Sequence, residues 1–163
     1  MAHALQPWQS IYSSSKVVAT VVTSLHISAL LFGGGLAVAA DRTTLRALGW
    51  DGDARGRALD ELDVVHKPVL LAISLSFITG ILLATADIET FAKSPYFWVK
   101  LSLVALLLLN GVFLRTTERA ARTAVAAGGT GDELYARLRI TSWLSITLWT
   151  AVLFAGVALT NAA

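Results

Sequence analysis

The positions of the charged residues constrain the fold of this chain more than any other feature of its sequence. The chain carries 13 Lys and Arg and 11 Asp and Glu residues among 163 positions, yet only Lys100 lies within four long apolar windows. The windows cover residues 17–40, 68–86, 94–114 and 140–163. A helix needs about 20 apolar residues to cross the hydrocarbon core of a bilayer, which is about 30 Å thick. The sequence therefore predicts an all-α integral membrane protein, an antiparallel four-helix bundle that forms a single domain over 1–163.

The composition excludes several other classes of protein. Hydrophobic residues make up 55% of the chain and charged residues only 15%, whereas a soluble domain carries about 25% charged residues. There is no Cys, which excludes a disulfide framework, a thiolate metal site and a Cys nucleophile. The expected environment is the lipid bilayer, and no nucleic-acid partner is expected.

The basic residues predict how the spans are oriented. Segments 41–67 and 115–139 each hold five Lys or Arg residues, whereas the segment before the first window and segment 87–93 each hold one. The excess of basic residues marks cytoplasmic loops. We therefore expect 41–67 and 115–139 to be cytoplasmic loops of a multi-pass protein of the bacterial inner membrane, with both termini periplasmic. Aromatic residues near the outer ends of the spans, such as Trp8 and Trp98, agree with this orientation.

Local signals predict several helix ends. Ser94 precedes Pro95, which places an N-cap hydroxyl before a proline at the first helical position. Nothing ends this helix at Leu114, so we expect it to continue to the glycines at 128–129 and to form a hairpin with the fourth span. In the first cytoplasmic segment, Asp53 is a candidate N-cap for a short surface helix.

His26 is the strongest candidate for a functional residue, because polar groups inside a membrane are costly and typically functional. At helical rise it lies about 14 Å below the start of its span, close to the bilayer midplane. A neutral imidazole there is suited to ligate haem iron or another transition metal. Gly33 shares the helical face of His26 and, with the next two glycines, removes the side-chain bulk that would exclude a flat macrocycle. Alternatively, His26 bonds a hydroxyl across the bundle or relays protons, and the glycines let helices approach closely.

The other two histidines are weaker candidates. His66 lies near the cytoplasmic start of the second span, about 18 Å in depth from His26 at helical rise. Axial ligands of one iron stand at nearly the same depth, so we expect His66 to be an interfacial residue rather than a second ligand. His3 occupies the third position of an amino-terminal copper motif, but removal of Met1 would destroy that spacing. A chain with one Met and no Cys also lacks the soft ligands typical of copper handling.

Lys100 is the only charge in any predicted span. At helical rise it lies about 7 Å below the outer interface, and within about 6 Å in depth of His26. Two interpretations are open: its ammonium group snorkels to the surface, or it turns inward as the counter-charge of a bound anion such as a haem propionate. Asn110, deeper in the same span, is typical of the polar residues that hold membrane helices together.

Short motifs along residues 25–111 form a pattern that is found in known membrane proteins. The motifs are Leu25-His26, Gly33-Gly34-Gly35 and Asp41-Arg42 in the first span, Phe77-Ile78-Thr79-Gly80 in the second, and Pro95 to Leu101 with Asn110-Gly111 in the third. The pattern resembles a small four-helix bacterial membrane protein family of unknown function. It is also similar to the membrane domain of copper-resistance D-type proteins and, more remotely, to membrane-type protoporphyrinogen oxidases. In those oxidases an intramembrane His is associated with b-type haem and a Lys on a later helix is important. The resemblance implies these roles for His26 and Lys100.

Two functional hypotheses from different classes follow. In the first, the chain is a b-type haem-binding redox or electron-transfer protein, with His26 as iron ligand, Lys100 as propionate counter-charge and Gly33 on the packing surface. It would then exchange electrons with a quinone or another redox partner, and a haem-dependent membrane oxidoreductase activity is compatible with this reading. In the second, the chain is a non-catalytic accessory subunit that forms a homo-oligomer or joins a larger membrane complex. The small residues Ser76, Gly80 and Ala84, at a spacing of four, suit such helix contacts.

Overall fold

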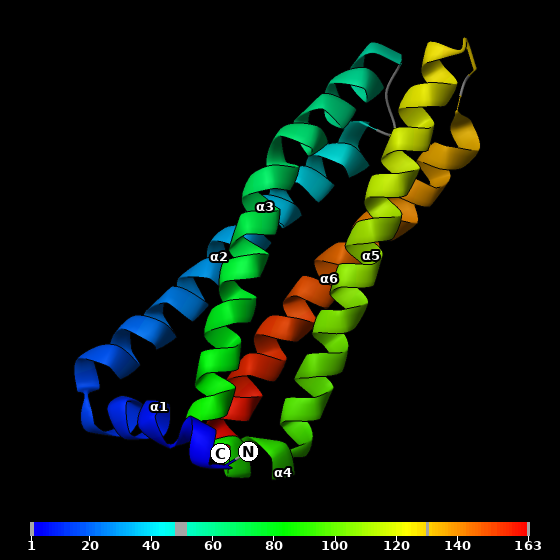
Figure 1. Ribbon diagram of the computed structural model, residues 1–163. Coiled ribbons are helices and arrows are strands. Elements are labelled where there is room, and N and C mark those ends of the chain that lie inside the picture. Colours follow the sequence, from blue (N-terminus) through cyan, green and yellow to red (C-terminus); the bar gives the residue numbers. More distant parts are fainter. Residues whose placement is uncertain (1, 48–51, 130, 163) are drawn as a thin grey trace.

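The computed structural model describes residues 2–47, 52–129 and 131–162, and all of its regular structure is helical (Figure 1). The helices of this described part are α1 (Ala2–Ser14), α2 (Lys16–Ala47), α3 (Gly52–Ala86), α4 (Ile88–Lys93), α5 (Pro95–Ala126) and α6 (Asp132–Ala162). Helices α2, α3, α5 and α6 are long and run the length of the molecule, whereas α1 and α4 are short and lie at one end.

The four long helices contain the predicted spans. Stretches long and apolar enough to cross a membrane cover Lys16–Arg46, Val64–Ala86, Pro95–Ala126 and Asp132–Asn161. The outer surface carries large hydrophobic side chains that are mostly exposed, among them Phe32, Leu71 and Phe154. Exposed apolar surface on this scale suits contact with lipid tails rather than water. The chain is thus a multi-pass membrane protein with an all-α, four-helix bundle.

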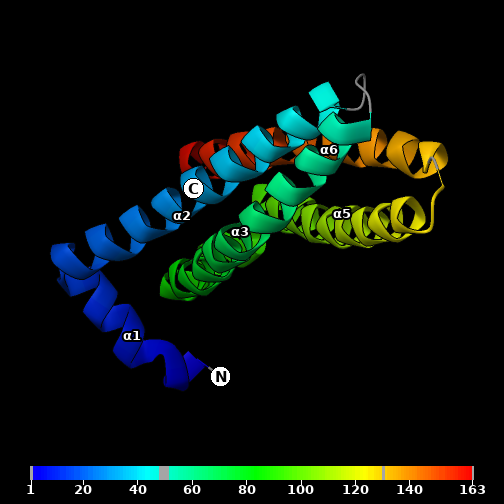
Figure 2. The same ribbon diagram turned by 90° about the horizontal axis from the view of Figure 1, so that it is seen from above.

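The bundle consists of two hairpins that meet mainly along one seam. Helix α2 packs along α3 and α5 packs along α6, while α2 against α6 forms the main contact between the hairpins. Helices α3 and α5 contact each other only slightly. Figures 1 and 2 show the arrangement of the four long helices in two views. Both chain termini lie at the end that holds α1 and α4, called here the terminal end. At the opposite end, the distal end, α2 and α5 end and α3 and α6 begin.

The segments predicted as cytoplasmic loops are largely continuations of the long helices. Helix α2 continues to Ala47, and α3 begins at Gly52 and passes through Pro68 without a break. The predicted short surface helix is therefore the first part of α3, and the side chain of its candidate cap, Asp53, lies outside the described residues. Helix α5 ends at Ala126, as predicted, and Gly128 follows it with a φ of +81°.

The start of α5 is confirmed, but its predicted cap differs in detail. Pro95 is the first residue of α5 and Ser94 is its N-cap, yet the Ser94 hydroxyl makes no capping hydrogen bond. Ser94 also ends α4, where its backbone N–H donates to the carbonyl oxygen of Phe91 at 3.1 Å. Ser94 is thus both the C-cap of α4 and the N-cap of α5, and only its backbone forms a capping hydrogen bond.

Helix α1 was not predicted, and it contains Pro7 in its interior, where a proline is unfavourable. It crosses the terminal end beside α2 and α3 (Figure 1). The Trp8 indole nitrogen donates to the carbonyl oxygen of Leu82 at 2.9 Å, and the ring centroids of Trp8 and Tyr12 are 5.6 Å apart. The aromatic residues expected at this interface therefore lie on a helix that is tied to the end of α3.

A polar layer separates two apolar clusters inside the bundle. The first cluster, towards the distal end, consists of Ala40, Leu114, Ala121, Tyr135 and Leu138. The second consists of Leu107, Leu148, Trp149 and Val152. Between them lie buried polar residues, namely Asp41 on α2, Asn110 on α5, and Ser142 and Ser145 on α6. Asn110 donates from Nδ2 to the carbonyl oxygen of Thr141 at 3.0 Å, which confirms the predicted contact between helices.

Candidate functional site

His26 projects from α2 onto the backbone of α3. Its Nδ1 lies 2.9 Å from the carbonyl oxygen of Ser76 and 3.1 Å from Oγ1 of Thr79. The Thr79 hydroxyl hydrogen is directed to a carbonyl of its own helix, since Oγ1 lies 2.7 Å from the oxygen of Leu75. Both partners of Nδ1 therefore act as acceptors, so Nδ1 must carry the hydrogen. In the neutral ring, Nε2 then holds the free lone pair.

Gly80 makes this close approach possible. A Cβ atom at Gly80 would lie 3.2 Å from Cε1 of His26, so the imidazole lies directly against the backbone of α3. Within the described part of the chain, Nε2 of His26 has no hydrogen-bond partner. The hydroxyl contact anticipated for His26 is thus confirmed, and it involves the nitrogen that a metal would not need. Ser76 and Gly80, two of the three predicted small contact residues, are used within this chain.

Lys100 lies at a similar height on the other hairpin. A Cβ atom at Gly156 of α6 would lie 3.4 Å from Nζ of Lys100, so the ammonium group rests against α6. Helices α3 and α6 both finish at the terminal end of the bundle. Gly80 lies six residues before the last residue of α3, and Gly156 lies six residues before the last residue of α6. His26, its partners Ser76, Thr79 and Gly80, and Lys100 are called the His26 site.

Gly33 and Gly34 bring α2 close to its neighbours. A Cβ atom at Gly33 would lie 2.9 Å from Cβ of Ala72, and one at Gly34 would lie 3.0 Å from Cε3 of Trp149. These two glycines therefore let α2 pack against α3 and α6. The role of Gly33 as a macrocycle contact stays a prediction.

His66 lies far from His26, as predicted. His26 contacts α3 at Ser76–Gly80, which is 10 to 14 residues beyond His66 and so roughly 15–21 Å along the helix. Nδ1 of His66 lies instead 3.9 Å from Oε2 of Glu118 on α5. The described residues contain no group of three or more His, Cys, Asp and Glu side chains that could hold a metal ion.

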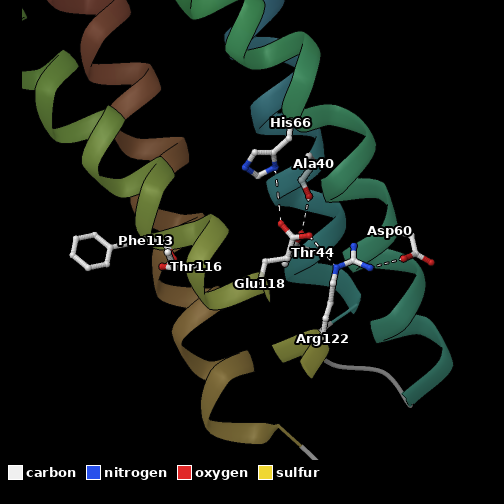
Figure 3. Close-up of polar contacts among 8 residues, drawn as sticks. All are labelled: Ala40, Thr44, Asp60, His66, Phe113, Thr116, Glu118 and Arg122. Carbon is white, nitrogen blue, oxygen red and sulfur yellow. Dashed lines mark hydrogen bonds and ion pairs between the residues drawn. The ribbon is translucent and has the colours of Figure 1, made fainter. Parts of the chain in front are cut away.

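Glu118 belongs to a network that the sequence did not predict. Its Oε1 lies 3.1 Å from Nε of Arg122, and Nη1 of Arg122 lies 2.7 Å from Oδ1 of Asp60 on α3 (Figure 3). Asp60, His66, Glu118 and Arg122, called here the distal cluster, join α3 to α5 where these helices otherwise contact little. One sequence signal could have indicated part of this network. Glu118 and Arg122 are four residues apart in the predicted helical continuation past Leu114, a spacing that allows an ion pair on one helix face.

The burial of Asp41 is a second feature, after the Glu118 network, that the sequence did not predict. It is 1% exposed, and neither carboxylate oxygen has a hydrogen-bond partner among the described residues. Its polar neighbours are the hydroxyls of Ser142 and Ser145 on α6. Asp41 directly follows the first apolar window and is the first residue of the segment 41–67, which was predicted to be a cytoplasmic loop.

Comparisons with known proteins add no identification. No protein-family model, curated protein or solved structure matches this chain. The resemblance based on residues 25–111 stays a prediction, and the function is argued from the geometry of the two sites.

Proposed function

We propose that this chain is a b-type haem-binding redox protein of the membrane, with Nε2 of His26 as the protein ligand of the iron. The observation that carries the proposal is the orientation of the imidazole, whose Nδ1 donates to the carbonyl oxygen of Ser76 at 2.9 Å. A metal-ligating His almost always donates its other ring nitrogen to a carbonyl or carboxylate, which fixes the tautomer and raises the basicity of the ligand. The ring of His26 already has this arrangement.

The residues around His26 would each have a defined task. The Ser76 carbonyl and the Thr79 hydroxyl hold the ring orientation, and Gly80 leaves room for the ring against α3. Lys100, the one charge in the apolar windows, would balance a propionate. When bound, a haem supplies a one-electron couple whose potential depends on its ligands and on burial. The proposal rests on His26 and Lys100, because Ala72 and Trp149 cover Gly33 and Gly34.

The orientation of the bundle is part of the proposal. The ends of the helices at the distal end carry most of the basic residues, five in each of the segments 41–67 and 115–139. The positive-inside rule then assigns the distal end to the cytoplasm and both termini to the periplasm of a bacterial inner membrane. In this orientation the His26 site lies nearer the periplasmic side, where a quinone or a periplasmic redox protein would reach it.

A visible spectrum tests the haem proposal. We expect the purified full-length protein, supplied with haemin, to show a Soret band that shifts when dithionite is added. The His26→Ala variant should lose this band, whereas His66→Ala, the matched control at the other depth, should keep it. A wild-type protein that takes up no haemin, or a His26→Ala variant with an unchanged spectrum, would contradict the proposal.

An accessory role is the second candidate, and one observation favours it. Gly35 on α2 and Gly111 on α5 are exposed, and a Cβ atom at either would meet nothing within 4 Å. Small residues on a lipid-facing surface let another membrane helix approach closely. If the chain is a subunit, Gly35→Leu and Gly111→Leu should abolish its co-purification with a partner or a second copy. Unchanged assembly in both variants would exclude this use of the two glycines.

A further inference from the structure

Asp41 presents a chemical problem that the haem proposal does not address. Its carboxylate is 1% exposed and both of its oxygens lack hydrogen-bond partners in the described part of the chain. An ionised carboxylate without partners is among the most costly groups to bury, inside a protein or in a membrane. The charge of Asp41 must therefore be neutralised by a bound species.

The surroundings of Asp41 favour a proton over a metal ion. The polar groups beside it on α6 are two hydroxyls, Ser142 and Ser145. Ca²⁺ takes six to eight oxygen ligands, and the described residues contain no group of three or more His, Cys, Asp and Glu side chains that could hold a metal ion. A protonated carboxyl group, by contrast, gains a donor. Among the residues that the structure describes, the buried Ser142 hydroxyl also has no hydrogen-bond partner, so its oxygen is available to accept from that donor.

The distal cluster leads from the surroundings of Asp41 to the aqueous phase. Asp60, whose side chain is 75% exposed, contacts Arg122, which contacts Glu118, whose side chain is 4% exposed. Glu118 in turn faces His66 across 3.9 Å (Figure 3). Val65, the residue before His66, packs against the apolar cluster that contains Ala40, the residue before Asp41. Asp60 also lines an open cavity of about 430 Å³ between α2 and α3. Chains of Asp, Glu and His that lead inward from the surface are typical of proton relays in membrane proteins.

We propose that Asp41 is a proton-binding site, flanked by Ser142 and Ser145 and loaded from the distal end through His66, which Glu118 faces. In the transfer step, an N–H bond of the His66 imidazolium breaks and an O–H bond forms on the Asp41 carboxylate. His66 then regains a proton from water, while Glu118 stays a carboxylate paired with Arg122. No electrons move, and the step needs no cofactor at the His26 site.

The other charged and titratable groups near Asp41 have separate tasks. On α5, Arg122 holds Glu118 in place and pairs with Asp60, so it orients the relay without carrying the proton. On α6, Tyr135 is buried in the apolar cluster that contains Ala40. His66 is thus the group that couples the protonation of Asp41 to the distal cluster.

Infrared spectroscopy of the full-length protein in phosphatidylcholine vesicles tests the proposal. With ¹³C-labelled Asp carboxyls, we expect a label-sensitive band of a protonated carboxylic acid at mildly acidic pH that disappears when the pH is raised. Asp41→Asn should remove this band, whereas Asp87→Asn, a change at an exposed cap of α4, should keep it. His66→Gln should keep the band and slow its response to a pH jump.

Three results would overturn the proposal. The first is the absence of a protonated Asp band from the folded wild type at every pH. The second is a band that survives in Asp41→Asn. The third is a band in the wild type that Na⁺ removes at constant pH while choline does not, which would show that a cation competes for the carboxylate. If Asp41→Asn does not fold, Asp41→Glu with labelled Glu provides the same assignment, because the band must then follow the Glu label.

Discussion

The His26 site and the distal cluster solve the same problem, polar groups inside a membrane bundle, in opposite ways. At the His26 site one imidazole is held by two acceptors from a single neighbouring helix, and one of its nitrogens is left free. In the distal cluster, acids and bases from two helices pair with one another and are progressively more exposed towards the end of the bundle. The first arrangement is suited to binding a ligand, and the second to holding helices together and moving charge.

Of the substitutions that distinguish the two regions, removal of the Glu118 side chain should lower the free energy of unfolding most. Glu118→Ala leaves Arg122 and His66 without their buried partner, and we expect the free energy of unfolding to fall by about 3 kcal/mol. This value lies at the low end of the range for breaking a buried ion pair, because Arg122 keeps its ion pair with Asp60. The change in the free energy of unfolding is measured by reversible unfolding in mixed micelles. Glu133→Ala is the matched control, because the pair of Glu133 and Arg137 is exposed on both sides and should contribute less than about 0.5 kcal/mol.

A smaller effect is expected at the helix contacts that position the His26 site. Gly33→Ala would place a Cβ atom 2.9 Å from Cβ of Ala72 and push α2 away from α3. Overpacking of this kind costs about 1–3 kcal/mol in the free energy of unfolding. Gly35→Ala, where the added atom meets nothing within 4 Å, should be neutral or stabilising. Equal losses in the two variants would show that helix flexibility, rather than the contact with Ala72, sets the effect.

The smallest effect concerns the hydrogen bonds of His26 itself. Thr79→Val removes one acceptor of Nδ1 and keeps the Ser76 carbonyl, so the ring orientation is weakened but not lost. We expect the affinity for haemin, measured by optical titration, to fall about tenfold. Thr85→Val is the control, since that hydroxyl bonds only to carbonyl oxygens of its own helix. A Thr79→Val variant with wild-type affinity would mean that the Ser76 carbonyl alone orients the ring.

The contrast between the regions also explains what the sequence could predict. His26 and Lys100 are conspicuous because each is isolated in an apolar window, and the four spans follow from the same windows. The separation of His26 and His66 was predictable because helical rise converts sequence distance into depth. The sequence alone also indicated the interhelical role of Asn110 and the extension of α5 past Leu114.

The distal end could not be predicted in the same way. Asp41 and Glu118 lie among other charges near the ends of the apolar windows, where hydropathy assigns them to water. Their burial depends on which helix faces them, and that is a tertiary property. For Asp41 the covering helix is α6, which contributes Ser142 and Ser145. The continuity of α3 through Pro68 and the presence of α1 despite Pro7 are likewise set by packing that overrides local preference.

The tautomer of His26 tests the central claim most directly. Nitrogen NMR of the full-length protein, with ¹⁵N-labelled His and assignment by the His26→Gln variant, separates protonated from unprotonated ring nitrogens. The account predicts that His26 carries its hydrogen on Nδ1, that Nε2 is unprotonated, and that haemin perturbs the Nε2 signal of His26 but not that of His66. A hydrogen on Nε2 of His26, or a haemin effect at His66 instead, would contradict it.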